Sequence, residues 1–264
     1  MSIEVSNLGV RVGRKQILSD VALCAKPGEV TAIVGPNGSG KTTFLKAISG
    51  DLPFTGMVRI NGAPLHGMKP WEAAGHRAVL PQASALSFPY KVREVVKLGL
   101  LSGRSGTTRA EQERLPEIAL ERVDLGGFSG RFYQELSGGE QQRVQLARVL
   151  CQVWRPVLDG QPRYLLLDEP VSSLDIKHQL IIMDIAAQFA AAGGGVLAVL
   201  HDLNLTARFA DRVAMMHRGK LVATGTPAEV FNDTLISDVF ECRIQVGVPP
   251  MGALPYILPQ SAQL

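Results

Sequence analysis

The sequence is short of cysteine and of net charge, and each shortage excludes a class of protein. Three cysteines, Cys24, Cys151 and Cys242, stand far apart in 264 residues, which argues against a disulfide framework or a zinc site and fits a reducing cytosol. We expect all three to be small buried hydrophobic residues. The formal net charge is +3 and no dense block of lysine and arginine occurs, so we expect no nucleic-acid partner.

Long apolar runs are also missing. The most apolar stretch, residues 180–200, contains Asp184 and Gln188 and is interrupted by glycines, so it falls short of the ~20 apolar residues that span a bilayer. The first residues lack a basic start followed by an apolar run, so we expect no secretory signal peptide. If the protein serves a membrane, a separate chain must cross it.

The apolar residues that are present form short runs separated by helical patterns. Residues 30–34 predict a strand that ends at Gly35, and residues 42–48 predict a helix closed by Gly50. Residues 164–167 and 196–200 are typical of buried parallel strands. We therefore predict an α/β fold with a mostly parallel sheet.

Two further parts are expected around this core. Alternating residues in 3–12 and 21–25 predict an N-terminal antiparallel β subdomain. Apolar residues recur at helical spacing from about 88 to 137, which predicts an inserted α-helical subdomain. We predict one domain over residues 1–242 and a tail rich in proline and glycine at 243–264, to which we assign no chemistry.

A glycine-rich turn carries the first chemical signal. The sequence from Gly35 to Thr42 matches G-x-x-x-x-G-K-[ST], follows a predicted strand and opens a predicted helix, which is the context of a phosphate loop. Backbone N–H groups and the helix N-terminus would face phosphate oxygens, Lys41 would pair with the β- and γ-phosphates, and Thr42 would ligate Mg²⁺. The predicted nucleotide-binding residues are Gly35, Pro36, Asn37, Gly38, Ser39, Gly40, Lys41, Thr42 and Thr43.

Two adjacent carboxylates end the predicted strand at 164–167. Successive strand residues face opposite ways, so Asp168 and Glu169 can serve different partners. We expect Asp168 to hold Mg²⁺, through water, and Glu169 to activate the attacking water as general base. Two acids at a strand end usually mark a solvated loop, and the functional interpretation depends on the phosphate loop. Together the two motifs indicate a P-loop nucleoside triphosphatase.

A third motif precedes the helix predicted at 140–153. Ser137 and Glu140 fit an S-x-x-E capping box that starts this helix. A capping box does not require Gly138 and Gly139, and two glycines at a helix N-terminus leave N–H groups open to an anion. A second phosphate site without a lysine suggests that each nucleotide is shared between two molecules.

These residues, in LSGGEQQR, resemble the signature sequence of ATP-binding cassette proteins, and the resemblance extends from about residue 3 to 239. By resemblance, Gln82 matches the glutamine that contacts Mg²⁺ and the coupling surface, and His201 matches the histidine that contacts the γ-phosphate. The resemblance implies a catalytic set of Glu169, His201, Lys41 and Gln82, and metal contacts from Thr42, Gln82 and Asp168. It also implies a signature segment, Leu136, Ser137, Gly138, Gly139, Glu140 and Gln141, and a D-loop, Ser172, Ser173, Leu174 and Asp175.

The family implies an assembly as well as a site. Two ATPase subunits would form a head-to-tail homodimer that closes on two ATP, with the signature of one chain completing the site of the other. This dimer would bind two transmembrane permease subunits, and indirectly a periplasmic substrate-binding protein, at the cytoplasmic face of the bacterial inner membrane. One departure is that no aromatic residue near Arg11 or Val12 is available to stack on adenine, so an arginine plane or an apolar side chain would have to pack there.

The cargo rests on weaker likenesses. Residues 87–96 and 200–207 resemble importer cassettes for iron–siderophore complexes, haem and vitamin B12, while the long segment 151–163 and the ending 255–260 are most like haem-import cassettes. We therefore expect ATP-driven import of haem, with a siderophore or vitamin B12 as alternative cargo. His66, His76, His178 and His217 are scattered, and we do not expect them to ligate haem.

Two rivals from other classes remain. A soluble cassette ATPase that acts as an iron–sulfur assembly factor is compatible with the length of the chain, and it would be distinguished by the absence of a membrane partner on purification. A P-loop kinase would leave residues 137–142 and His201 without a role.

Overall fold

A central sheet of six strands organises the molecule, and its order places the phosphate-loop strand in the middle. The computed structural model describes residues 1–82, 88–102, 105–249, 252 and 255–262. The strands run in the order β12-β11-β3-β10-β9-β6, all parallel except β12, which pairs antiparallel with β11. Their bounds are β3 Val30–Val34, β6 Arg77–Leu80, β9 Tyr164–Asp168, β10 Gly195–Val199, β11 Arg212–His217 and β12 Lys220–Gly225.

Every residue of β3, β9 and β10 is buried, because helices cover one face of these strands and a second sheet with α1 covers the other. The second sheet is antiparallel, in the order β2-β1-β4-β5. Its strands are β1 Ile3–Val12, β2 Lys15–Ala25, β4 Thr55–Ile60 and β5 Ala63–Pro64. Helix α1, Lys41–Ser49, packs its buried side chains Phe44 and Ile48 into the core between the two sheets. A two-residue turn, Asn61 and Gly62, both with positive φ, joins β4 to β5.

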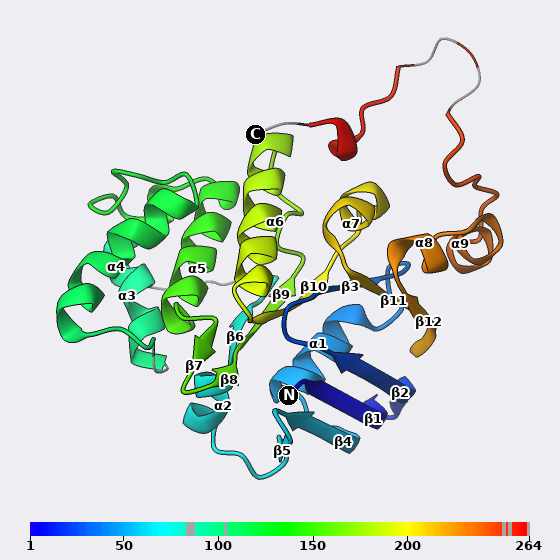
Figure 1. The fold of residues 1–264 in the computed structure, drawn as a ribbon, viewed down its shortest axis with the longest axis horizontal. Helices are drawn as coiled ribbons and strands as arrows, with labels where there is room; N and C mark the ends of the chain where they lie inside the picture. The colour runs from blue at the N-terminus through cyan, green and yellow to red at the C-terminus, as the bar shows by residue number, and fades with distance from the viewer. Residues whose placement is uncertain (83–87, 103–104, 250–251, 253–254, 263–264) are drawn as a thin grey trace.

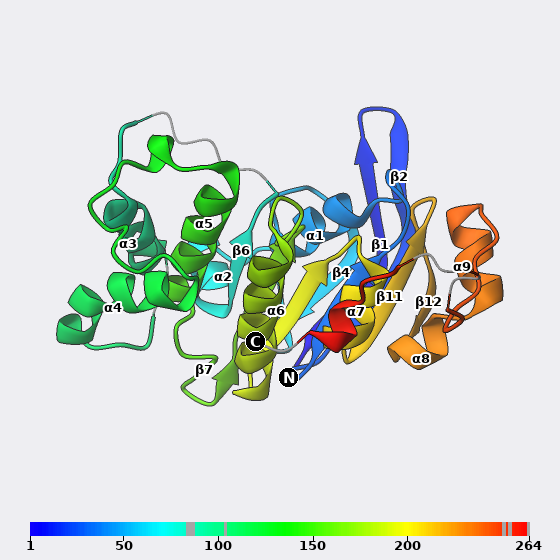
Figure 2. The same ribbon diagram turned by 90° about the horizontal axis from the view of Figure 1, so that it is seen from above.

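Three helices, α3, α4 and α5, lie together at one end of the molecule (Figure 1). Helices α3 and α4 pack on α5, and the antiparallel sheet with α8 and α9 lies at the other end (Figure 2). The helices are α2 Pro70–His76, α3 Val92–Ser102, α4 Arg109–Arg122, α5 Gly138–Gln152, α6 Ile176–Ala191, α7 Leu203–Phe209, α8 Pro227–Val230 and α9 Asp233–Phe240. The short elements η1 Tyr133–Glu135, β7 Val157–Leu158, β8 Gln161–Pro162 and η2 Pro259–Ser261 complete the fold.

Some expectations need correction or fall outside these residues. Cys151 is buried, but the prediction that Cys24 and Cys242 are buried is wrong: Cys24 lies on the outer side of β2, and Cys242 follows α9 at the surface. Ser87, the first residue of the 87–96 stretch, and parts of the predicted tail lie outside the described residues. The domain bounds at 88–137 and 242 stay predictions.

Candidate nucleotide site

The loop between β3 and α1 can only be built with glycine at two positions. Gly35 has φ of 143° and Gly40 has φ of 104°, a region that other residues rarely adopt. A Cβ on Gly35 would lie 2.0 Å from the carbonyl oxygen of Met216, and a Cβ on Gly40 would lie 2.6 Å from Leu18 Cδ2. The strand–turn–helix order predicted for the phosphate loop is therefore packed tightly against β2 and β11.

Lys41 begins α1 and is buried. Its Nζ donates to the carbonyl oxygens of Gly35 at 2.8 Å and Pro36 at 2.9 Å. Burial lowers the pKa of this ammonium, while the nearby charges of Glu169 and Asp168 oppose the shift. No side chain caps the start of α1, where Gly40 is the N-cap residue. The buried hydroxyl of Ser39 also has no hydrogen-bond partner in the described chain. These features suit an incoming anion that accepts several hydrogen bonds.

Thr42 and Asp168 bring oxygen atoms together at the ends of α1 and β9. The Thr42 hydroxyl donates to Asp168 Oδ1 at 3.0 Å, and Asp168 is 2% exposed. Burial raises the pKa of the Asp168 carboxyl, with the hydrogen bond from Thr42 acting against this shift. A buried carboxylate beside a hydroxyl and within one residue of a second carboxylate is a hard-oxygen setting, which fits Mg²⁺.

Glu169 has an unusual backbone conformation. It has φ of 53°, a left-handed conformation that is uncommon for residues other than glycine and asparagine. Its carboxylate lies between two side chains that follow neighbouring strands, His201 after β10 and Gln82 after β6. His201 Nε2 is 2.7 Å from Oε1, and Gln82 Nε2 donates to Oε2 at 2.9 Å. The structure thus brings Gln82, Glu169 and His201 into direct contact at the carboxyl ends of β6, β9 and β10.

Sequence reasoning missed one residue that supports this arrangement. Gln142 on α5 donates from Nε2 to the backbone carbonyl oxygen of Glu169 at 2.9 Å. The Ser172 hydroxyl donates to the same oxygen at 3.2 Å. Gln142 lies within the LSGGEQQR segment, and its polar side chain is half-buried on α5. Its place in that segment is the signal in the sequence that could have identified it. The contact itself, across 27 residues, has no signal in a single sequence.

The predicted capping box at the start of α5 is confirmed. The Ser137 side chain accepts from the Glu140 N–H at 3.3 Å, and Glu140 Oε2 accepts from the backbone N–H and the hydroxyl of Ser137 at 2.8 and 2.7 Å. No atom outside the helix would touch a Cβ on Gly138, whereas a Cβ on Gly139 would lie 3.0 Å from Leu174 Cδ2. A side chain at Gly138 would therefore meet open space, whereas a side chain at Gly139 would press against the D-loop.

The signature segment and the phosphate loop do not meet within one chain. No hydrogen bond or ion pair joins residues 136–141 to residues 35–43, and the structure describes both segments throughout. Asp175 of the D-loop caps α6 by accepting from the His178 N–H at 2.9 Å. The signature segment starts α5, whereas the phosphate loop leads into α1, so within one chain the two segments belong to different helices.

Two hollows lie near these residues. One of about 260 Å³ is lined by Pro36–Ser39 and by Arg218 and Glu241, whose side chains form an ion pair at 2.7 Å.

The position that lacks an aromatic residue lies at the end of β1, where Val12 is 56% exposed and Arg11 Nε donates to Gln16 at 2.6 Å. An exposed valine at this position agrees with an apolar surface for a nucleotide base.

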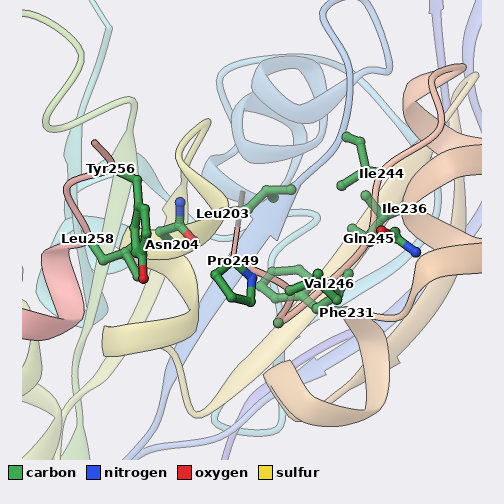
Figure 3. Close-up of a pocket in the computed structure, with 12 residues that line it drawn as sticks. Leu203, Asn204, Phe231, Ile236, Ile244, Gln245, Val246, Pro249, Tyr256 and Leu258 are labelled. Atoms are coloured by element: carbon green, nitrogen blue, oxygen red, sulfur yellow. The ribbon is translucent and has the colours of Figure 1, made fainter. Parts of the chain in front are cut away.

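A second hollow, of about 510 Å³, contains none of the predicted site residues. Figure 3 shows Tyr256 and Leu258 of the tail on one side and Ile244 and Ile236 on the other. The tail returns to α7 through η2, and Gln260 Nε2 donates to the Asn204 carbonyl oxygen at 2.9 Å (Figure 2). The tail is therefore packed beside the helix that follows His201.

A model of the ABC transporter family matches residues 18–172, a range that begins before the phosphate loop and ends within the D-loop. The chain belongs to the ABC transporter family. This cassette is 66% identical over 260 residues to a hemin import ATP-binding protein, HmuV, of Mesorhizobium japonicum, covering 98% of this chain and 99% of the relative. It is 58% identical to the hemin import ATP-binding protein HmuV of Rhizobium meliloti, covering 99% and 100%.

Solved structures agree with this assignment and confirm the predicted fold class. An ATP-binding subunit of an ABC transporter aligns with a TM-score of 0.77 at 25% identity, covering 92% of this chain and 95% of the other. MJ0796, a bacterial ABC transporter cassette solved as a dimer, aligns with a TM-score of 0.74 at 27% identity, covering 85% and 98%. Membership of the family makes the cassette an ATP-binding ATPase. No helix in the described part of the cassette is both long and apolar enough to cross a membrane.

Proposed function

We propose that this cassette hydrolyses ATP with Glu169 as the general base. The observation that carries the proposal is the position of the Glu169 carboxylate, held between His201 Nε2 at 2.7 Å and Gln82 Nε2 at 2.9 Å. A carboxylate fixed at both oxygens can orient a water and accept its proton. The γ-phosphate would lie between Glu169 and the phosphate loop, where Lys41 and the N–H groups of α1 stabilise its charge.

Mg²⁺ would be held by the hydroxyl of Thr42, the carboxylate of Asp168 and the side chain of Gln82. When bound, the ion neutralises charge on the β- and γ-phosphates. The Thr42 hydroxyl donates its hydrogen to Asp168, which leaves the lone pairs of its oxygen available to the metal. Burial disfavours the ionised form of Asp168, and a bound cation removes that penalty. The metal and the nucleotide would therefore bind together.

The complete site would require a second copy of this chain. A Cβ on Gly138 at the start of α5 would meet open space, no hydrogen bond joins this segment to the phosphate loop of its own chain, and MJ0796 provides a related cassette that is dimeric. In a head-to-tail homodimer, Ser137, Gly138 and Gly139 of one chain would contact the γ-phosphate held by the other. Closure on ATP and opening after hydrolysis would form the switch.

We propose haem as the cargo and a transporter at the cytoplasmic face of the inner membrane as the setting. The support is the 66% identity to a hemin import ATP-binding protein over 98% of the chain, together with similar names for the other relatives. The homodimer would bind two transmembrane permease subunits and, through them, a periplasmic binding protein. Haem would bind to those partners and not to the histidines of this cassette.

The site is tested by Glu169→Gln. The variant should bind ATP with unchanged affinity, and its hydrolysis should fall at least 100-fold, the scale expected for loss of a general base. Phosphate release at saturating ATP measures the loss, and a fluorescent ATP analogue measures binding. Hydrolysis within tenfold of the wild type would rule out this role for Glu169.

The cargo is tested by growth of a strain that lacks this gene under iron starvation. Failure on haem alone, restored by the wild type but not by Glu169→Gln, supports haem import. Growth on haem with failure on a ferric siderophore would keep the transporter and replace its cargo. Normal growth on every iron source would contradict iron uptake altogether.

A further inference from the structure

The end of α4 is fixed to the signature helix by a buried arginine. Arg143 on α5 is 7% exposed, and its Nη1 donates to the carbonyl oxygens of Val123 at 2.9 Å and Asp124 at 2.7 Å. Asp124 has φ of 57°, which turns the chain at this point. These two hydrogen bonds connect the backbone at the end of α4 to the helix that carries the signature.

The side chain of Asp124 reaches across to α6, the helix that follows the D-loop. Asp124 Oδ2 accepts from Lys177 Nζ at 2.6 Å and lies 3.3 Å from His178 Nε2. The other ring nitrogen, His178 Nδ1, is 2.7 Å from Oδ1 of Asp175. His178 thus joins two carboxylates, one at the end of α4 and one in the D-loop.

The charges favour this junction. A neutral imidazole has one N–H donor, so both carboxylates receive a hydrogen bond only when the His178 ring carries two protons. The hydrogen bond from Lys177, with a further contribution from His178, lowers the pKa of Asp124. The backbone N–H of His178 lowers the pKa of Asp175. Both carboxylates are therefore held in the ionised form, which accepts hydrogen bonds from Lys177 and from His178.

The signature and the D-loop, which the junction connects through α5 and α6, also contact each other directly. A Cβ on Gly139 of the signature would meet Leu174 Cδ2 at 3.0 Å and the Ser173 carbonyl oxygen at 3.2 Å. A change in the angle between α5 and α6 would therefore alter the contact between the signature and the D-loop. Arg143, Asp124 and His178 form a second connection between these two helices.

We propose that Asp124 and His178 are positioning residues that fix the D-loop relative to the signature, so that both reach the partner's nucleotide together. The proposal rests on the shared nucleotide site described above. Neither side chain would touch ATP. Their effect would pass through Asp175 to the D-loop and through the backbone of α4 and Arg143 to α5, and it would be felt at the nucleotide bound by the other chain.

Asp124→Asn and His178→Gln test this in the full-length chain. Asparagine tolerates positive φ, so Asp124→Asn removes the charge without forcing the backbone to change. Each variant should keep the affinity of the monomer for ATP within about twofold and lower kcat about fivefold, a loss on the scale of a part-exposed ion-pair junction. The double variant should be no slower than the slower single variant, because both remove one shared interaction.

The control is Glu113→Gln, which removes exposed ion pairs with Lys97 at 3.0 Å and Arg93 at 3.4 Å inside the helical region. It should leave kcat unchanged. ATP-driven dimerisation in the Glu169→Gln background, measured by sedimentation, should be weaker when Asp124→Asn is added. Equal dimerisation would contradict the junction, as would parallel losses of monomer affinity and kcat. Failure of Glu169→Gln alone to dimerise would instead contradict the shared nucleotide site.

Discussion

Two helices of this cassette begin beside glycines, and they treat their open N-termini in opposite ways. Helix α1 has no side-chain cap, and it begins with a buried lysine. Helix α5 satisfies its own first turn with Ser137 and Glu140. The start of α1 has no side chain that accepts from its first N–H groups. At the start of α5 the capping box satisfies the N–H groups of Ser137 and Glu140, and no described residue accepts from those of Gly138 and Gly139.

The difference predicts the order of events. The α1 site should bind ATP in the isolated chain, because burial of Lys41 and Asp168 leaves charges that phosphate and a cation would stabilise. The α5 site should act only when a partner chain presents a phosphate to the open N–H groups of Gly138 and Gly139. Substitutions at these two helix starts, and at Asp168 beside the first of them, would break or sharpen this contrast.

The largest effect should follow from Lys41→Ala. Removing a buried charge-assisted donor at the phosphates should weaken ATP binding and hydrolysis by roughly 100-fold or more. Lys46→Ala, at the exposed end of the same helix, is the matched control and should change affinity less than about threefold. Titration with a fluorescent nucleotide compares the two, and similar losses would show that α1 acts through net charge alone.

The signature glycines should give an intermediate effect that separates stability from activity. Gly139→Ala places a methyl group against Leu174, so it should lower both the melting temperature and, by roughly tenfold, kcat. Gly138→Ala points into open space, so it should stabilise the isolated chain by about 0.5 kcal/mol. If a partner's phosphate lies against this face, Gly138→Ala should still reduce kcat, and unchanged turnover would contradict that placement.

A smaller effect is expected for Asp168→Asn in the absence of nucleotide. Burial raises the pKa of this carboxyl from 3.8, so its favourable contribution exists at low pH and is lost as pH rises through the raised pKa. At pH 7 the variant should therefore be more stable in urea, by about 1 kcal/mol. It should also lose the additional stabilisation that Mg²⁺ gives to the nucleotide complex, and destabilisation at pH 7 would disprove the argument.

The smallest effect concerns the pH dependence of the α5 cap. The hydrogen bonds from Ser137 lower the pKa of Glu140 from 4.5. Its contribution to stability is therefore present above that value and is lost as pH falls through the lowered pKa. Glu140→Gln keeps the shape and should change the free energy of unfolding by less than about 0.5 kcal/mol at pH 7. Melting curves between pH 3 and 6 should converge for the two proteins; a constant gap would exclude the charge as the cause.

The sequence predicts local features of the site well because each depends on neighbours in the chain. The phosphate loop, the capping box and the end of the helix at Gly50 are fixed by residue types within a few positions, and the structure confirms the capping box and the left-handed Gly50. Helix starts differ by one or two residues, since α5 begins at Gly138 and not at 140.

Features that depend on distant contacts were not visible without the family resemblance. Gln82 and His201 have no periodic signal, and they matter because β6 and β10 both adjoin β9. The positive φ of Glu169 and the contact between Asp124 and His178 follow from tertiary packing alone. The surface position of Cys24 follows from which side of β2 faces outward, which pattern and composition left open.

The sheet order also bears on how the cassette is made. Strand β3, which leads into the phosphate loop, comes early in the chain, yet both of its neighbours, β10 and β11, come late. During synthesis β3 therefore has no parallel partner until β10, residues 195–199, has left the ribosome, and its second neighbour follows only with β11 at 212–217. A chain that stalls before that point would expose β3 as an unpaired apolar edge, and its recognition by chaperones would precede any binding of nucleotide.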